Sequence, residues 1–275
     1  MSETAIIDGV EFDLPARPAV LAELSAELES YDPDFRKVSN LVNKDLGLAA
    51  AVVRAANSPL FGVSGRIVSV QQAVNFLGLA QVFALITGVM LRRVFPEDDS
   101  LIDELWDMST KRAAIMAQLA HNTLMPADRA YTVGLFQDCG VALLAMRSPH
   151  YRGTWARARW AVDAPRIEQR EHAADHSRLS ATLARHWGFA SEIALALAQH
   201  HDIDSLDSPE PSRVRGFVAL SVFANFALAG TSSRDDASWA ASLEKAAATF
   251  ELSPLTAQAW LEQAKLHLDA CAAAL

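Results

Sequence analysis

The spacing of apolar residues predicts helices along most of the chain. Apolar side chains recur every three or four positions, as on the buried face of an amphipathic helix, and almost no stretch alternates as a strand does. After Pro18 this pattern gives four or five short helices before Pro96, the first ending near Asp32 because a proline disfavours helix at the residue before it. Beyond Pro96 we expect helices near 101–122, 129–146, 154–161, 176–187, 191–201, 212–229, 236–250 and 254–273. The pattern predicts an all-α protein.

Capping residues and one linker divide this helical pattern. Ser69 with Gln72 three residues later forms a capping-box pattern, and Ser253 before Pro254 is typical of a helix start. The stretch FPEDDS, residues 95–100, holds a proline and three acids, and its last residue, Ser100, is expected to cap the next helix. We therefore expect a helical lobe over residues 12–95 and a second one over 100–275.

One apolar run raises the question of a membrane. Ala73 to Leu91 carries no charge and meets the length criterion for a spanning helix. The run also contains Asn75, Gln81 and two glycines, and it lacks aromatic anchors at both ends. We expect a buried helix of a soluble domain, and no membrane insertion.

Composition and charge narrow the function classes. Hydrophobic residues make up 51% and charged residues 21% of the chain, which is typical of a folded globular protein. The formal net charge of −9 would repel a phosphate backbone unless basic side chains cluster. Six arginines lie between positions 147 and 170, but Asp163, Glu168 and Glu171 interleave with them, so we expect a solvated helical face. Nucleic acid is not an expected partner.

Cysteine usage and the first residues bear on location. Cys139 and Cys271 are too few, and too far from any ligand spacing, to indicate a disulfide framework or a zinc knuckle. The start of the chain, MSETAIIDGVEFDLP, lacks the basic and apolar regions of a signal peptide. Both observations lead us to expect a reducing, cytoplasmic location.

Four residues could carry chemistry: Asp138 within GLFQDCG, His176, His200 and His201. They fall on successive predicted helices, and a metal-dependent hydrolase needs imidazoles and carboxylates that converge in this way around an activated water. A histidine at a helix terminus can equally be a capping or dipole partner, and His200 with His201 could be solvent-exposed. Spacing alone leaves these alternatives open.

Other conspicuous residues fit structural roles. Asn57 and Ser58 are expected to end a helix and shape the loop before Phe61 and Gly62. Tryptophans at helical spacing beside leucines and alanines are expected to pack in the core, namely Trp106, Trp187, Trp239 and Trp260.

Several segments, in this order, resemble a known family. RAANSPLFGVSGRIVSVQQAVNFLGL, residues 54–79, resembles the signature of the bacterial HDOD family. LWDMSTKRA (105–113), YTVGLFQDCGVALL (131–144), DHSRLSATLARHWGF (175–189) and ALAQHH (196–201) resemble segments of the HD fold, which HDOD domains share with metal-dependent phosphohydrolases. The similarity extends over residues 12 to 230 and implies an N-terminal helical lobe packed on a degenerate HD-type lobe.

The resemblance also implies where a metal site would lie. The HD pattern needs histidines at positions 108 and 137, and an aspartate at 225, where this chain has Met108, Gln137 and Asn225. A thioether is a poor ligand for such ions, and the two amides remove an imidazole and a negative charge. Asp138, His176, His200 and His201 remain as weak candidates for a metal. The Gly-Tyr-Pro segment of related cyclic-dinucleotide phosphodiesterases is absent after His201, where the chain continues DIDSLDSPEP.

These departures favour a non-catalytic module. We expect a bacterial signal-transduction protein that binds a protein partner, holds no metal or other cofactor, and packs Gly134 and Gly140 closely around an inactive cleft. The acidic net charge suits a protein partner better than DNA. The alternative is a divergent metal-dependent phosphohydrolase that cleaves a nucleotide second messenger through the four candidates. A third hypothesis is ligand sensing in the same cleft without turnover.

Overall fold

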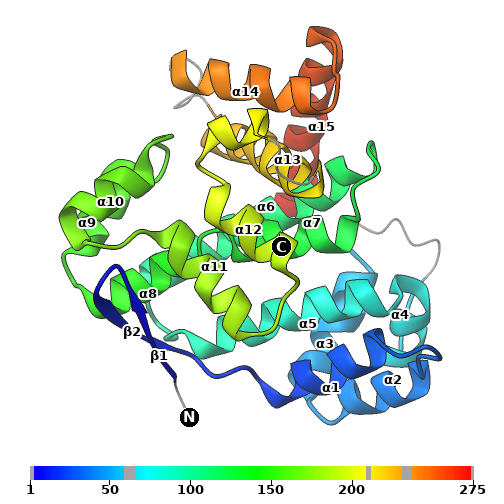
Figure 1. Cartoon of the computed structure of the whole chain (residues 1–275). Helices are drawn as coiled ribbons and strands as arrows, with labels where there is room; N and C mark the ends of the chain where they lie inside the picture. The colour runs from blue at the N-terminus through cyan, green and yellow to red at the C-terminus, as the bar shows by residue number, and fades with distance from the viewer. Residues whose placement is uncertain (1–2, 59–65, 209–211, 231–236, 274–275) are drawn as a thin grey trace. The chain divides into compact units, whose positions relative to one another are not determined.

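The structure, a computed structural model, describes residues 3–58, 66–208, 212–230 and 237–273. These residues form helices and one antiparallel hairpin, which confirms the all-α fold class (Figure 1). The chain divides into two compact units. The first unit comprises Arg17–Pro96 with Asp269–Leu275, and the second comprises Met1–Ala16 with Glu97–Leu268. Residues 12–16, which we expected in the N-terminal lobe, are therefore grouped with the second unit.

The first unit contains the short helices that the apolar spacing predicts. They are α1 (Ala19–Leu28), α2 (Phe35–Asn43), α3 (Leu46–Ala56), α4 (Val70–Leu77) and α5 (Leu79–Val94). Their apolar stripes meet in a core that includes Leu21, Val42, Val52 and Val82. Ser69 accepts a hydrogen bond from the backbone N–H of Gln72, as the capping pattern predicts.

The uncharged run from Ala73 to Leu91 is two helices rather than one. The α4 and α5 helices meet at Gly78 with a bend of 117°. Gly78 has a φ of +78°, which a residue with a side chain rarely adopts. The prediction of one continuous helix is thus wrong, whereas the predicted burial of this run is confirmed for most of its apolar residues. Among the described residues no single helix is long and apolar enough to cross a membrane, and α4 with α5 meets that criterion only as a bent pair.

Asn57 closes the loop that follows α3. Its side-chain N–H groups donate to the carbonyl oxygens of Val53 and Ile67, each at 2.8 Å, and its Oδ1 accepts from the Ile67 N–H at 2.9 Å. One side chain therefore joins the two ends of the loop, which confirms the structural role predicted for it. Phe61 and Gly62 lie outside the described residues.

The second unit begins with a hairpin that the apolar spacing did not predict. Strands β1 (Glu3–Ile7) and β2 (Val10–Leu14) pair antiparallel around Asp8 and Gly9, both with positive φ. Asp-Gly is a strong hairpin turn signal, because both residues tolerate this conformation. Phe12 and Leu14 are buried, and the Arg147 guanidinium of a following helix lies over the Phe12 ring, 5.3 Å from its centre.

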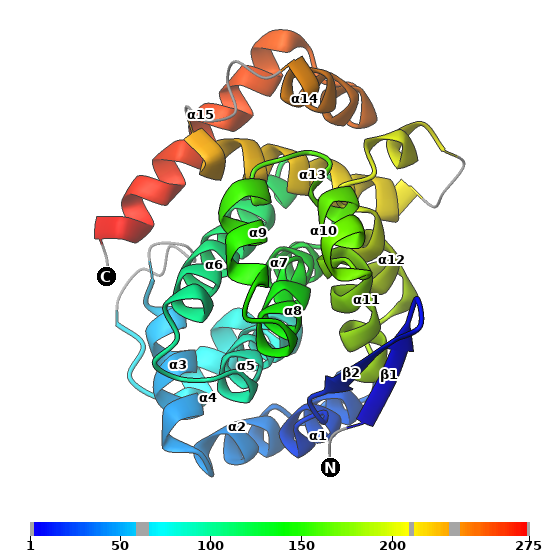
Figure 2. The same cartoon turned by 90° about the vertical axis from the view of Figure 1, so that its left-hand side faces the viewer.

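The helices of the second unit follow in chain order: α6 (Ser100–Ala120), α7 (Ala127–Phe136), α8 (Cys139–Arg147), α9 (Tyr151–Ala158), α10 (Ala164–His172), α11 (His176–His186), α12 (Ser191–Gln199), the short 3-10 helix η2 (Ile203–Asp207), α13 (Ser212–Ala229), α14 (Ala237–Thr249) and α15 (Pro254–Ala273). The part of α15 up to Leu268 belongs to this unit. Helix α6 packs on α7 and α13, α11 on α8 and α12, and α9 lies beside α10 (Figure 2). The predicted helix 129–146 is broken into α7 and α8, and α10 was not predicted.

Helix caps in this unit correct one prediction and confirm another. Asp99 rather than Ser100 caps α6, because its Oδ1 accepts from the N–H groups of Leu101 and Ile102. Ser253 caps α15 by accepting from the Thr256 N–H, as predicted.

Gly134 and Gly140 allow close helix packing. A Cβ at Gly134 would lie 2.8 Å from the Cα of Ala113 on α6. A Cβ at Gly140 would lie 2.2 Å from the carbonyl oxygen of His176 on α11. The close packing expected at both glycines is confirmed, and Gly140 sets how near α8 comes to the start of α11.

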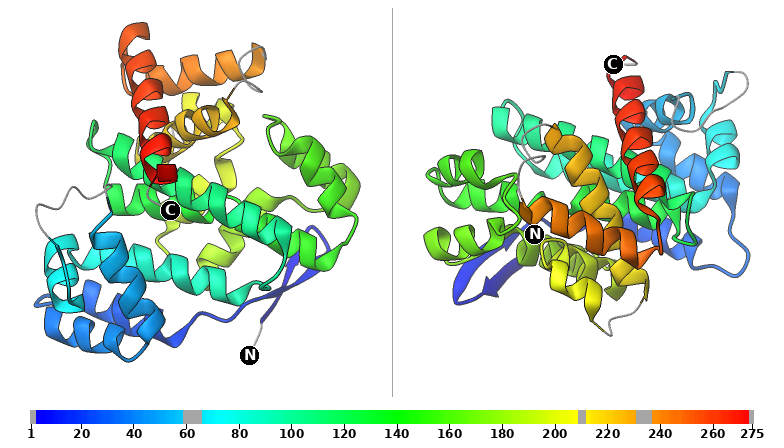
Figure 3. Two further views of the ribbon diagram at one scale, coloured as in Figure 1. Left: turned by 180° about the vertical axis from the view of Figure 1, so that it is seen from behind. Right: turned by 90° about the horizontal axis from the view of Figure 1, so that it is seen from above.

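Three of the four tryptophans expected in the core are buried. Trp187, Trp239 and Trp260 are buried, whereas Trp106 is half-buried. The Trp260 ring of α15 lies 5.4 Å from the Phe223 ring of α13, which attaches the last helix to the unit. Two further views show the red ribbon of this last helix (Figure 3).

Candidate functional site

Asp138 lies at the break between α7 and α8. Gln137 ends α7 and Asp138 precedes α8, with a backbone conformation (φ −109°, ψ 13°) outside the helical region. The Gly140 N–H donates to the Ser180 hydroxyl of α11 at 2.9 Å, and that hydroxyl donates to the Gln137 carbonyl. These contacts with α11 replace helical hydrogen bonds at the break. The Asp138 carboxylate is thereby fixed in the buried interior of the unit.

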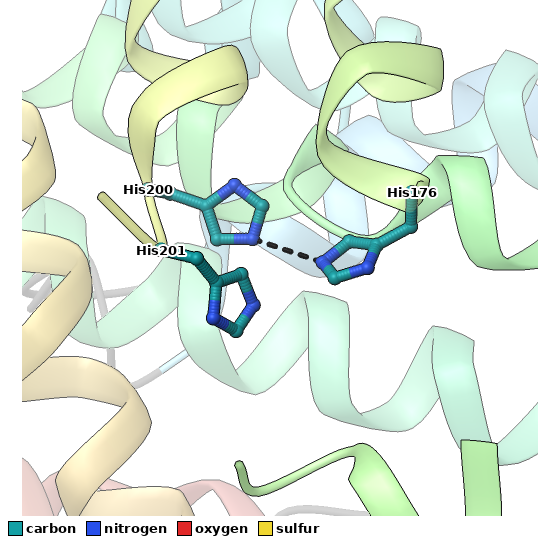
Figure 4. Close-up of side chains that lie close together, drawn as sticks. All are labelled: His176, His200 and His201. Atoms are coloured by element: carbon teal, nitrogen blue, oxygen red, sulfur yellow. Dashed lines mark hydrogen bonds between the residues drawn. The ribbon is translucent and has the colours of Figure 1, made fainter. Parts of the chain in front are cut away.

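Three histidines converge near Asp138, with their rings turned toward one another (Figure 4). His176 begins α11, His200 ends α12, and His201 follows it. The Nε2 atoms of His176 and His200 are 3.2 Å apart. Asp138 Oδ1 lies 3.6 Å from the first and 3.7 Å from the second. The structure thus brings all four predicted candidates together, and exposure of the histidine pair is excluded because His200 is buried and His201 is half-buried.

Sequence reasoning missed Arg112, which holds Asp138. This arginine lies on α6, one turn beyond Met108, and only 2% of it is exposed. Its Nη2 lies 2.7 Å from Asp138 Oδ2, and its Nε donates to Asn225 Oδ1 at 2.6 Å. Arg112 stands within the LWDMSTKRA segment, four residues after a residue already assigned to the site. That helical spacing was the available signal.

Glu168 is a second residue that sequence reasoning placed wrongly. It is fully buried on α10, not part of a solvated face. Its Oε2 accepts from the backbone N–H of His176 at 2.9 Å and from the Nδ1 of the same residue at 2.7 Å. Its Oε1 accepts from the Tyr151 hydroxyl at 2.5 Å. Glu168 therefore fixes the orientation of the His176 ring.

The hydrogen bonds and charges assign different protonation states to the three histidines. Burial opposes a charge on His176, but Glu168 and Asp138 outweigh it and raise its pKa to about 9. Burial, and then the charge of His176, lower the pKa of His201 to about 4. Burial is the main cause that lowers the pKa of His200 well below its usual value, and the neighbouring His201 and His176 lower it further. His176 is thus an imidazolium that donates to a neutral His200, whose Nδ1 donates to the Leu197 carbonyl.

Two cationic and two anionic side chains face one another in this cluster. Arg112 and His176 are cations, and Asp138 and Glu168 are anions. Although burial alone raises the pKa of the Glu168 carboxyl, the His176 charge and hydrogen bonds lower it below its usual value. The cluster therefore consists of two ion pairs, Arg112 with Asp138 and His176 with Glu168. The two pairs meet where Asp138 lies 3.6 Å from His176.

The residues of this cluster fit a metal in spacing but not in charge. The candidate ligand atoms of His176, His200 and His201 lie within 4.8 Å of one another, and two nitrogens 3.2 Å apart suit an ion about 2.0–2.1 Å from each. The Asp138 carboxylate, however, is already paired with the Arg112 guanidinium. The positive guanidinium would repel a divalent ion bound beside it, so Arg112 and a metal would compete for Asp138.

All three positions that depart from the HD pattern are buried, and one of them contacts the guanidinium. Met108 and Gln137 are buried, and the Gln137 Oε1 has no hydrogen-bond partner among the described residues. Asn225 presents a neutral amide oxygen to Arg112 where the HD pattern has a carboxylate. The charge of the Arg112 guanidinium is thus balanced by one carboxylate, that of Asp138.

Three of the six arginines between positions 147 and 170 pair with acids. Arg152 pairs with Asp99, and Arg159 pairs with Glu104 near the start of α6. Arg157 binds both carboxylate oxygens of Glu171. These pairs attach α9 to α6 and α10.

Comparison with known proteins identifies the family. A model of the HDOD domain matches residues 14–203. A curated relative, an uncharacterized protein of Treponema pallidum, is 22% identical over 229 residues, which are 82% of this chain and 44% of that protein. The chain thus spans less than half the length of this relative. Since the family model covers more than half of the chain, the protein belongs to the HDOD domain family.

Solved structures share the fold. An HDOD domain protein of unknown function from Geobacter sulfurreducens matches with a TM-score of 0.72 at 21% identity, covering 95% of this chain and 92% of that one. A candidate signal transduction protein from Marinobacter aquaeolei matches with a TM-score of 0.71 at 22% identity, covering 95% and 59%. A candidate metal-dependent phosphohydrolase from Shewanella amazonensis matches with a TM-score of 0.65 at 17% identity, covering 93% and 92%. At identities of 17–22% these likenesses show a shared fold.

Proposed function

We propose that this chain is a non-catalytic signalling module that acts by binding a protein partner. The observation that carries the proposal is the buried pairing of Arg112 with Asp138. In an HD-type hydrolase the carboxylate helps to hold a metal ion, and the ion lowers the pKa of a bound water. A guanidinium supplies a fixed charge but no open coordination position, and it does not deprotonate in proteins.

The buried polar contacts around Asp138 also support a structural role for this cluster. Arg112, Asp138, Glu168 and Asn225 come from α6, the α7–α8 break, α10 and α13, so one set of polar contacts links most of the unit. Removing one member of a buried ion pair leaves a buried charge without its partner, which typically costs about 3–5 kcal/mol. The network thus keeps the helical surfaces of the module in fixed positions for a partner.

A phosphohydrolase is the second candidate function. The spacing of the three imidazoles favours it, because those atoms could surround an ion if Arg112 moved away. In that case hydrolysis of a nucleotide second messenger would depend on Asp138, His176, His200 and His201.

A phosphodiesterase assay separates the two functions. Cyclic dinucleotides and bis(p-nitrophenyl) phosphate would be incubated with the protein in the presence of Mn²⁺, Fe²⁺ or Zn²⁺, alongside Asp138→Ala. We expect no turnover above the blank for either form. Turnover that disappears in Asp138→Ala would contradict the proposal.

A gain-of-function variant sharpens this test. Gln137→His restores one imidazole of the HD pattern but leaves Met108, Asn225 and the Arg112 to Asp138 pair in place. We expect this single variant to remain inactive. Hydrolysis by it would show that Arg112 does not block the site.

The partner itself is found by affinity capture from the native host. The control is the double variant Arg112→Ala with Asp138→Ala. It removes both charges of the pair, so that no unpaired charge is left in the interior. Capture of one specific protein by the wild type, without hydrolysis, would support the module. Failure of capture together with metal-dependent turnover would support the enzyme.

A further inference from the structure

A cavity of about 360 Å³ lies beside the histidine cluster and is open to solvent. The start of α10, the start of α11 and the end of α12 form its walls, and His201 lines it. The volume falls at the small end of the range for ligand pockets, about 300–1,000 Å³. A ligand of metabolite size therefore fits this cavity better than a nucleic acid or a peptide helix.

Two carboxylates of the cavity wall are not used by the fold. Asp163 and Asp202 are exposed and precede helices without capping them. Neither side chain has an ion pair or hydrogen bond within the described residues. The third acid of the wall, Asp175, differs, because it caps α11 through the Arg178 N–H. Two acceptor groups are thus available to a ligand.

Donor groups line the same cavity. The Ser177 hydroxyl lies in the first turn of α11, is only 2% exposed as a residue, and has no hydrogen-bond partner among the described residues. A buried hydroxyl without a partner is costly, so it indicates a missing contact. The first turn of a helix also carries a partial positive charge. Arg166 and Gln169 of α10 add a cationic and a neutral donor group.

The balance of these groups selects the charge of the ligand. Among the described residues of the cavity wall, the side chains without a hydrogen bond or ion pair are two carboxylates, one guanidinium, one amide and one hydroxyl. The guanidinium, that of Arg166, also interacts with the charge of Asp204 outside the wall. A dianionic phosphate would be repelled by both carboxylates. A simple amine has no anionic group to pair with Ser177 and Arg166. A molecule with one ammonium and one carboxylate group matches both sets.

We propose that this cavity binds a small zwitterion of the free amino acid class. Its ammonium group pairs with Asp163 and Asp202, and its carboxylate pairs with Arg166 and the Ser177 hydroxyl. The proposal goes beyond the module function and does not depend on it. His201 lines the cavity and its ring lies 5.0 Å from that of His176, so a bound ligand would adjoin the buried network.

Isothermal titration calorimetry with individual L-amino acids tests the proposal. We expect at least one of them to bind the full chain. The amide of that amino acid, which lacks the carboxylate, and its analogue without the amino group should each bind about ten- to a hundredfold more weakly, because each loses a charged hydrogen bond.

Matched variants locate the site. Asp202→Asn and Arg166→Gln should each weaken binding about tenfold or more, while circular dichroism and the melting temperature stay unchanged because both side chains are exposed. Arg185→Gln, at the other end of α11 and outside the cavity lining, should bind as the wild type does.

Three results would overturn the proposal. They are no heat of binding from any L-amino acid at about 10 mM, equal binding of the singly charged analogues, and equal binding by Asp202→Asn. None of these outcomes bears on whether the chain hydrolyses phosphodiesters, so the proposal can fail independently of the proposed function.

Discussion

Arg112 Nη2 lies 2.7 Å from Asp138 Oδ2 in the interior of the second unit, where an HD-type hydrolase would hold a metal ion. The guanidinium compensates the carboxylate charge that the ion would otherwise compensate. In the function proposed above, this guanidinium takes the place of the metal ion.

Removing this cation should be costly. In Arg112→Met the buried Asp138 carboxylate loses its 2.7 Å partner and keeps only the 3.6 Å contact with His176, so we expect the free energy of unfolding to fall by about 3 kcal/mol. Urea denaturation of Arg112→Met, Asp138→Asn and the double variant measures the coupling. The double variant should be more stable than the sum of the single losses indicates. The exposed Arg157→Met serves as the control and should remain close to the wild type. Equal stability of Arg112→Met and the wild type would contradict a structural role for the pair.

Gly140 should not tolerate a side chain. The Cβ of Gly140→Ala would overlap the His176 carbonyl at 2.2 Å, so α8 and α11 must separate, and we expect a loss of about 1–3 kcal/mol or more in the free energy of unfolding. Gly153→Ala on α9 is the matched control, because its Cβ would come no nearer than 3.5 Å to the Arg157 side chain. Alanine is the better helix former by about 1 kcal/mol, so this control should be neutral or stabilising. Thermal denaturation of the two variants checks the difference, and a similar loss in both would contradict the packing argument.

The sequence alone predicts some of these features and not others. Ser69 and Ser253 were found because a cap is a local pattern, and the HD-like segments were found because their order is distinctive. Arg112 and Glu168 were not found, because a charged residue looks the same in sequence whether a partner buries it or water surrounds it. The break after Gln137 depends on α11, which the local apolar pattern of α7 and α8 does not reveal. The hairpin at Asp8 and Gly9 carried its own turn signal, which the helical pattern of the remaining chain obscured.

The imidazolium at His176 predicts a pH dependence. Its pKa of about 9 exceeds the unfolded value of 6.5, so the folded state binds the proton more tightly than the unfolded state does. The resulting stabilisation, about 3 kcal/mol at most, is fully present below pH 6.5 and is lost as the pH rises through 9. Urea denaturation between pH 6 and 10 measures it. In His176→Asn the decline assigned to this residue should disappear. An unchanged decline in this variant would assign the effect to other groups.

Cys139 should resist alkylation in the native protein. Burial, the largest effect, raises the pKa of its thiol to about 12, and the thiolate is the reactive form. We expect iodoacetamide at pH 8 to leave Cys139 unmodified in the folded protein and to modify it in urea. Mass spectrometry of the tryptic peptide measures this directly. The side chain of Cys271 lies outside those that the structure describes, so the peptide of Cys139 must be followed separately. Rapid native modification of Cys139 would show that the α7–α8 break opens readily.

The metal stoichiometry of the purified protein tests the central claim most directly. The wild type and Asp138→Ala would be equilibrated with Zn²⁺ or Mn²⁺, dialysed without chelator, and analysed by inductively coupled plasma mass spectrometry. If Arg112 supplies the cation of this site, both forms should retain far less than one ion per chain. One tightly held ion per wild-type chain, lost in Asp138→Ala, would contradict the account.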